Sequence, residues 1–100
     1  MTIIITGGTK GIGKAIALTL AKNHHNLVLT YVNDKKNALQ SKEEIEKYAN
    51  VLVLKSDVSK EEEVIKLLDI IISKFGSIDV LINNAGISID TTLEDKTVDN

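Results

Sequence analysis

The stretch TGGTKGIGKA, residues 6–15, carries four of the six glycines of the chain and follows the apolar run 3–5 directly. Glycine reaches positive φ without strain and lets other atoms approach the backbone closely. So many glycines between an apolar run and a helical pattern predict a strand, a tight turn and a helix. The turn is suited to a nucleoside triphosphate, to a dinucleotide or to a purely structural role, and the glycines alone do not decide among them.

Two phosphate-binding patterns overlap in this turn. From Gly8 the residues fit the triphosphate loop G-x-x-x-x-G-K, but Ala15 stands where a Ser or Thr hydroxyl must bind Mg²⁺. Read one residue earlier, Gly7, Gly11 and Gly13 fit a variant of the dinucleotide fingerprint, in which they serve the tight turn, the approach to the pyrophosphate and the close packing of the helix. The helix N-terminus would then attract the phosphates. The missing hydroxyl favours the dinucleotide.

Short apolar runs alternate with longer helical patterns along the whole chain. The predicted strands are residues 2–6, 26–32, 51–55 and 78–83, and the predicted helices are 12–23, 34–49 and about 60–75. Ser59 and Glu62 have the spacing of a capping box at the start of the last helix, and Gly76 is a typical helix stop. Strict alternation predicts an α/β fold with a parallel sheet, in one domain over residues 1–100.

In such a sheet the ligand crevice lies at the carboxyl ends of the strands. Gly7, Tyr31, Asp57 and Asn84 come at those ends. By itself Asp57 could equally be a solvated carboxylate.

Composition removes several classes of function. The 12 basic and 14 acidic residues are interspersed and give a net charge of −2, so the sequence offers no basic stripe for nucleic acid. Cysteine is absent, which excludes disulfides and thiolate metal sites and fits a reducing, cytoplasmic location. No apolar run approaches the roughly 20 residues of a membrane span. We expect no metal, no membrane and no nucleic acid as partners.

Three motifs, TGGTKGIGKAIA, LKSDVS and LINNAG, occur in this order, and together they resemble the N-terminal part of a classical short-chain dehydrogenase/reductase from residue 2 to about 93. The resemblance implies a Rossmann-type parallel sheet with helices on both faces, here incomplete, with strands 1 to 4 in the order 3-2-1-4. It also implies a nicotinamide cofactor and hydride transfer to or from a carbonyl or alcohol carbon.

The resemblance assigns cofactor-binding roles to twelve residues. The pyrophosphate loop would comprise Gly7, Thr9, Lys10, Gly11, Ile12 and Gly13; Tyr31 would lie at the adenosine ribose, Asp57 and Val58 at the adenine, and Asn84, Ala85 and Gly86 at the nicotinamide side.

NADP is the favoured cofactor and NAD the alternative. A site for NAD places an acid at the tip of the second strand, where this chain has Tyr31. Lys10 occupies the position where the family's NADP-dependent members carry a basic residue, and a cation close to a 2′-phosphate is strongly favourable. Asp34 supports NAD if the strand ends later than expected.

No catalytic residue is expected in this chain. Tyr31 and Lys35 match the family's Y-x-x-x-K spacing, but they straddle a strand end and a loop, whereas the chemistry requires both on one helix face. The family's catalytic residues come later in its members, which the resemblance implies are more than twice this length and commonly homo-oligomeric. This chain alone would therefore bind a dinucleotide without reducing a substrate, and its fourth strand would be an apolar edge.

The segment 86–95, GISIDTTLED, resembles a loop of the 3-oxoacyl-[acyl-carrier-protein] reductases of the family, which suggests a 3-oxoacyl thioester; other carbonyl or sugar-alcohol substrates stay open. The alternative function is a stand-alone dinucleotide-binding or interaction module without catalysis.

Overall fold

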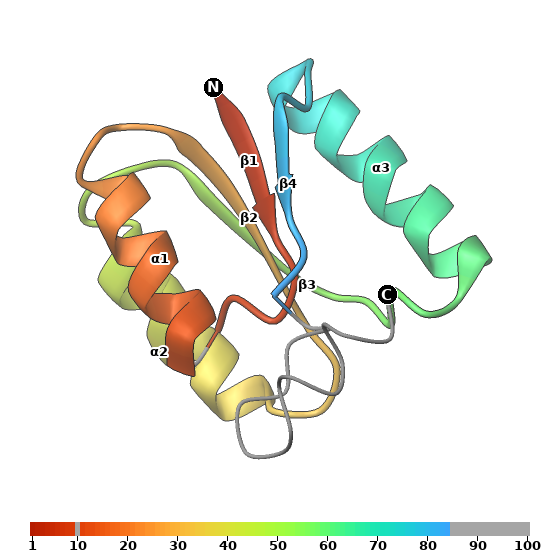
Figure 1. Ribbon diagram of the computed structural model, residues 1–100, viewed down its shortest axis with the longest axis horizontal. Helices are drawn as coiled ribbons and strands as arrows, with labels where there is room; N and C mark the ends of the chain where they lie inside the picture. The colour runs from red at the N-terminus through yellow and green to blue at the C-terminus, as the bar shows by residue number, and fades with distance from the viewer. Residues whose placement is uncertain (10, 85–100) are drawn as a thin grey trace, which may run out of the picture.

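Strands and helices alternate strictly in the computed structural model, which describes residues 1–9 and 11–84. The elements are β1 (Thr2–Ile5), α1 (Gly11–Ala21), β2 (Asn26–Tyr31), α2 (Lys35–Ile45), β3 (Val51–Lys55), α3 (Glu61–Phe75) and β4 (Val80–Ile82). The strands pair in parallel in the order β3-β2-β1-β4 (Figure 1). The predicted α/β class and strand order are confirmed.

Helices cover both faces of the sheet, with α1 and α2 on one face and α3 on the other (Figure 1). Side chains alternate along a strand, so the continuous apolar runs of β1 and β2 supply a core to each face. On the α1 and α2 face the fully buried core is Ile5, Leu27, Leu29, Ala17, Ala21 and Ile45. On the α3 face the buried core is Ile4, Val28, Leu67 and Ile71.

The second helix is shorter than predicted. It ends at Ile45 rather than at residue 49, and Ile45 is its last fully buried residue. The carbonyl of Ile45 accepts hydrogen bonds from the backbone N–H groups of both Tyr48 and Ala49, at 2.9 and 3.2 Å. These bonds turn the chain back toward β3, which begins only at Val51.

The predicted capping box at the start of the third helix is wrong. The N-cap of α3 is Lys60, and it makes no side-chain capping bond. The Ser59 hydroxyl donates instead to Asp57 Oδ1 at 2.6 Å, since Ser59 precedes the N-cap and lies in the turn that begins at Asp57. The predicted stop is right: Gly76 caps the helix with a φ of 83°.

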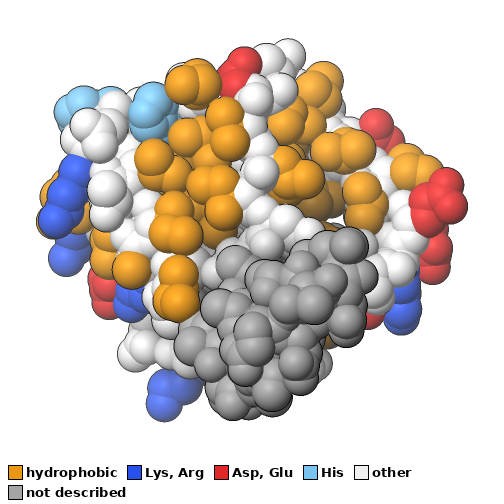
Figure 2. Space-filling view, viewed as in Figure 1, with side chains coloured by type: hydrophobic (Ala, Val, Ile, Leu, Met, Phe, Trp, Pro, Cys, Tyr) orange, Lys and Arg blue, Asp and Glu red, His pale blue; other side chains and the backbone are white. Residues whose placement is uncertain are grey.

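Apolar side chains lie exposed beside β1 and β4. Figure 2 shows hydrophobic side chains gathered over α1 and, on the other side, toward α3. Leu81 of β4 is 62% exposed, Ile72 of α3 48% and Ile12 of α1 45%. Since β4 is an edge of the sheet formed by the described strands, the predicted apolar edge strand is present.

Candidate functional site

The turn between β1 and α1 adopts a backbone conformation that only glycine accepts easily. The φ angle is 65° at Gly7 and 61° at Gly11, a region that costs other residues about 1–2 kcal/mol. A Cβ placed on Gly11 would meet no atom of residues 1–9 or 13–84 within 4 Å. Gly11 is therefore required by its backbone angle and not by close packing against the described residues.

Gly13 is required by the approach of other atoms. A Cβ at this position would lie 2.5 Å from the Gly7 carbonyl oxygen, 2.6 Å from Asn84 Nδ2 and 2.9 Å from the Gly8 Cα. The sequence predicted that this glycine lets the helix pack close to the sheet. The structure adds that its nearest neighbours are the turn itself and the residues that follow β4.

Side chains from three other elements hold the turn in place. Asn84 Nδ2 donates to the Gly7 carbonyl at 3.0 Å, and the Gly7 N–H donates to Thr30 Oγ1 of β2 at 3.2 Å. Ser41 of α2 is fully buried and its hydroxyl donates to the Thr9 carbonyl at 2.5 Å. The turn is thus fixed by β2, by α2 and by the end of β4.

Ser41 and Thr30 were missed by the sequence reasoning. Ser41 stands in phase with Ala38 and Ile45 on the buried face of α2, where a polar residue needs a hydrogen-bond partner. A serine in an otherwise apolar helical stripe was the available signal. Thr30 offered none, because threonine is common in strands.

An open cleft of about 410 Å³ lies beside the turn at the carboxyl ends of β1, β2 and β3. Four predicted site residues line it together: Gly7, Tyr31, Asp57 and Val58. The other lining residues are Thr30, Val32, Ser56, Ser59 and Asn83.

Asp57 is the charged group of this cleft. Its Oδ1 accepts from the Ser59 hydroxyl at 2.6 Å and from the Ser59 N–H at 3.0 Å. These two bonds, with a smaller contribution from the positive charge of Lys60, hold the pKa of the Asp57 carboxyl below its ordinary value of 3.8, although desolvation opposes them. The carboxylate is an obligate hydrogen-bond acceptor at neutral pH.

Other predicted site residues lie elsewhere. Thr9 is buried, and Asn84 contacts the turn rather than lining the cleft. Ile12 lies in a separate shallow groove on α1. Three more of the predicted residues, Lys10, Ala85 and Gly86, lie outside the described residues, as does the segment 86–95.

The structure also places the Tyr31 and Lys35 pair and the possible ribose acceptor Asp34, which follow one another at the end of β2. Tyr31 ends β2 and Lys35 begins α2, so they do not share a helix face. Asp34 is the N-cap of α2: its Oδ1 accepts from the Asn37 N–H at 3.1 Å and its Oδ2 from the Asn37 side-chain amide.

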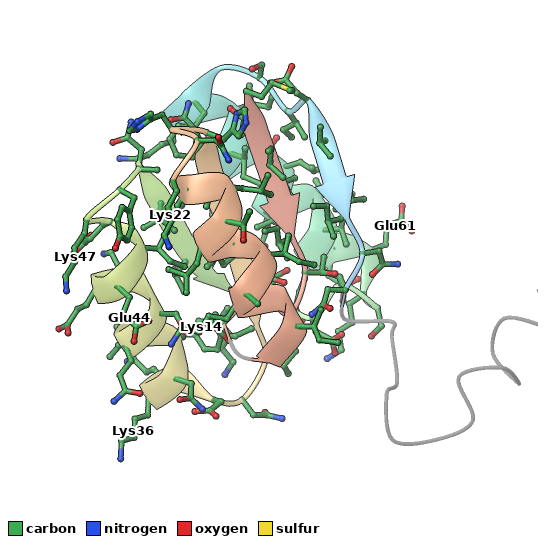
Figure 3. The ribbon with its side chains drawn as sticks, turned by 60° about the vertical axis from the view of Figure 1, so that its left-hand side comes forward. Lys14, Lys22, Lys36, Glu44, Lys47 and Glu61 are labelled. Atoms are coloured by element: carbon green, nitrogen blue, oxygen red, sulfur yellow. The ribbon has the colours of Figure 1, made fainter. Side chains whose placement is uncertain are left out.

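An ion pair joins the two helices next to the turn. Lys14 Nζ of α1 lies 2.9 Å from Glu44 Oε2 of α2, and Figure 3 shows the two side chains pointing toward one another.

Among residues 1–9 and 11–84, no three His, Cys, Asp or Glu side chains are grouped to hold a metal ion. No helix in the same part of the chain has the length and apolar character needed to cross a membrane.

Comparison with known proteins agrees with this geometry. The family model of the short chain dehydrogenases matches residues 1–100. The chain is 40% identical over 91 residues to a Staphylococcus epidermidis 3-oxoacyl-[acyl-carrier-protein] reductase FabG, covering 90% of this chain and 37% of that protein. A Staphylococcus aureus protein of the same name is 38% identical over the same shares of the two chains.

Solved structures give the same result. A short-chain dehydrogenase from Oenococcus oeni has a TM-score of 0.80 at 40% identity, over 90% of this chain and 40% of that one. A dehydrogenase/reductase from Sinorhizobium meliloti has a TM-score of 0.81 at 34% identity, over 94% of this chain and 38% of that one. The chain thus spans less than half the length of these relatives. With its Rossmann-type sheet and glycine turn, the chain belongs to the short-chain dehydrogenase family.

Proposed function

We propose that this chain is the cofactor-binding part of an NADP-dependent oxidoreductase that transfers hydride to a carbonyl substrate. The observation that carries the proposal is the glycine turn, which opens onto a cleft lined by Gly7, Tyr31, Asp57 and Val58. A fixed turn at a helix N-terminus beside a cleft at the carboxyl ends of the strands is the arrangement that binds the pyrophosphate and the adenosine of a dinucleotide.

Each part of the site has a separate task. The turn around Gly11 would bind the pyrophosphate through backbone N–H groups, and Asp57 would accept a hydrogen bond from the adenine amino group. Asn84, which bonds to the Gly7 carbonyl, would hold the turn at the nicotinamide side. When bound, the nicotinamide supplies the hydride. We assign no proton-transferring residue to this chain.

Two observations favour NADP over NAD. β2 ends at Tyr31, so no carboxylate stands at its tip to accept from a ribose 2′-hydroxyl. Asp34, the alternative acceptor, caps α2 with Oδ1 on the Asn37 N–H and accepts from the Asn37 side-chain amide with Oδ2. Lys10 is the proposed 2′-phosphate contact, from its position in the sequence.

The substrate proposal rests on the staphylococcal relatives named 3-oxoacyl-[acyl-carrier-protein] reductase, and we propose a 3-oxoacyl thioester. Cytoplasmic location and homo-oligomeric assembly belong to the same proposal.

Titration calorimetry of the purified chain tests the cofactor. We expect saturable binding of NADPH, weaker binding of NADH and none of Mg·ATP. Lys10→Ala should reduce the preference for NADPH about tenfold or more, since it removes a charge-assisted contact. Lys22→Ala, directly after the C-terminal end of α1, is the matched control and should leave the ratio of affinities unchanged. Equal affinities for NADPH and NADH in the parent chain would refute the NADP assignment, and tight binding of Mg·ATP would refute the dinucleotide.

The coding DNA beyond residue 100 tests the catalytic part of the proposal. A Tyr-x-x-x-Lys motif in the same reading frame, with NADPH-dependent reduction of a 3-oxoacyl thioester by the encoded protein, is the expected result. A stop codon at this point, together with a stable chain that binds NADPH, would favour the stand-alone binding module.

A further inference from the structure

Asp57 is held from three sides by the segment that leads into α3 and by the first turn of that helix. Its backbone N–H donates to Glu63 Oε1 at 2.8 Å, and its carbonyl accepts from the Lys60 N–H at 3.0 Å. Its Oδ1 accepts both hydrogen bonds from Ser59. Within the described residues Oδ2 makes no hydrogen bond, so it is the one polar atom of Asp57 left for a ligand in the cleft.

These four hydrogen bonds fix the direction of the Asp57 carboxylate as well as its charge. The bond to Glu63 fixes the peptide plane before Asp57, and the two bonds from Ser59 fix the rotation of the carboxylate. A carboxylate without these bonds could turn toward water or toward a different part of a ligand. The ordering is achieved on folding, so binding loses little further entropy there.

Glu63 differs in this respect from the two acids before it. Glu61 and Glu62 are exposed, whereas Glu63 is partly buried, with one carboxylate oxygen on the Asp57 N–H and the other 3.9 Å from Lys60 Nζ. All three acids lie in the first turn of α3, where negative charge complements the helix N-terminus. The structure gives Glu63 an additional contact that the other two do not make within the described residues.

We propose that Glu63 and Ser59 are positioning residues that make the cleft select a purine with an exocyclic amino group over one with an oxo group. This inference rests on the proposed dinucleotide function. Asp57 Oδ2 accepts from an amino group such as that of adenine. The oxo group of hypoxanthine would place a second acceptor against the same oxygen, so the hydrogen bond made by the amino group would be lost.

The test compares NADPH with its hypoxanthine analogue by titration calorimetry. The two dinucleotides differ at the purine 6-position and at the adjacent N1, which is an acceptor in adenine and an N–H donor in hypoxanthine, so their ratio of affinities reports the hydrogen bonds at that edge of the base. A hydrogen bond to a charged group is worth about tenfold or more in affinity, and we expect the parent chain to prefer NADPH by that factor.

Four variants then assign the selectivity. Glu63→Ala and Ser59→Ala should each reduce the preference to about threefold or less. Glu63→Gln should keep it, because the glutamine side-chain oxygen can still accept from the Asp57 N–H. Glu62→Gln, on the same turn of α3, is the matched control and should equal the parent chain. Ser59 is outside the helix, so its variant is the safer of the two if Glu63→Ala folds poorly.

The outcomes separate this inference from the proposed function. A parent chain that fails to bind NADPH refutes the proposed function. A parent chain that binds both dinucleotides equally well refutes the inference alone. Glu63→Ala and Ser59→Ala variants that lose affinity for both dinucleotides by the same factor also refute it, since a purely structural role would leave the ratio unchanged.

Discussion

Replacing Gly13 by alanine tests whether the glycine turn is as tightly packed as the structure indicates. The new methyl carbon would lie 2.5 Å from the Gly7 carbonyl oxygen and 2.9 Å from the Gly8 Cα. Both are backbone atoms, which cannot rotate away. The third neighbour, Asn84 Nδ2 at 2.6 Å, could move only by giving up its 3.0 Å hydrogen bond to the Gly7 carbonyl.

Two opposing effects decide the sign of the change. Gly13 lies inside α1, and alanine there is intrinsically favoured by about 1 kcal/mol. Overpacking against backbone costs about 1–3 kcal/mol or more, and the loss of the Asn84 bond costs about 1 kcal/mol further. The net expectation is a loss of about 1–3 kcal/mol, or a fall in Tm of roughly 5–20 °C for a domain of this size.

Thermal and urea unfolding followed by circular dichroism measure the effect. Gly11→Ala is the matched comparison, because a Cβ there meets no atom of the described part of the chain within 4 Å, whereas its φ of 61° opposes the change. We expect Gly13→Ala to be the more destabilised of the two. A Gly13→Ala chain as stable as the parent, or more stable, would refute the reasoning, since helix propensity would then outweigh the contacts.

Three further predictions concern stability. Ser41→Ala should cost about 1–3 kcal/mol in urea unfolding, because it leaves a carbonyl of the glycine turn without its buried donor; an unchanged midpoint would contradict this. Since the pKa of Asp57 is lowered on folding, its contribution to the free energy of unfolding is present above pH 3.8 and is lost as the pH falls further. Ser59→Ala should therefore make the unfolding midpoint less steeply dependent on pH below about 4. Identical slopes in the two proteins would contradict the role of the Ser59 hydrogen bonds. Ile71→Ala should cost about 2–5 kcal/mol, whereas its exposed neighbour Ile72→Ala should stay within about 0.5 kcal/mol, and equal losses would show that α3 packs differently.

The arrangement of the elements could be predicted from the sequence because it depends on the backbone. The apolar run of β1, the glycines after it and Gly76 after α3 constrain backbone conformation directly. Such signals act within a few residues of the chain and do not depend on which other elements pack against them. For the same reason Gly7, Tyr31 and Asp57 were placed correctly at the strand ends, and the structure brings them to one cleft.

Side-chain partners could not be predicted, because they depend on elements distant in the sequence. Ser41 lies 32 residues after Thr9, and the sequence does not say which carbonyl its hydroxyl meets. The wrong capping box shows the same limit over a short range. By sequence alone the Ser59 hydroxyl could bond either to the N–H groups of the first turn of α3 or to the Asp57 carboxylate. The path of the chain from β3 into α3 places it on Asp57.

The peptide groups beside the proposed ligand site are each fixed by a hydrogen bond to a side chain from another part of the fold. The Gly7 carbonyl is held by Asn84, the Thr9 carbonyl by Ser41, and the N–H of Asp57 by α3. Because a trans peptide is planar, fixing its carbonyl also fixes the direction of the N–H on the other side. The partners come from α2, from α3 and from the end of β4, which meet only when the sheet has formed. The site is therefore assembled by the same contacts that fold the chain, and a ligand bound there stabilises the folded state as a whole.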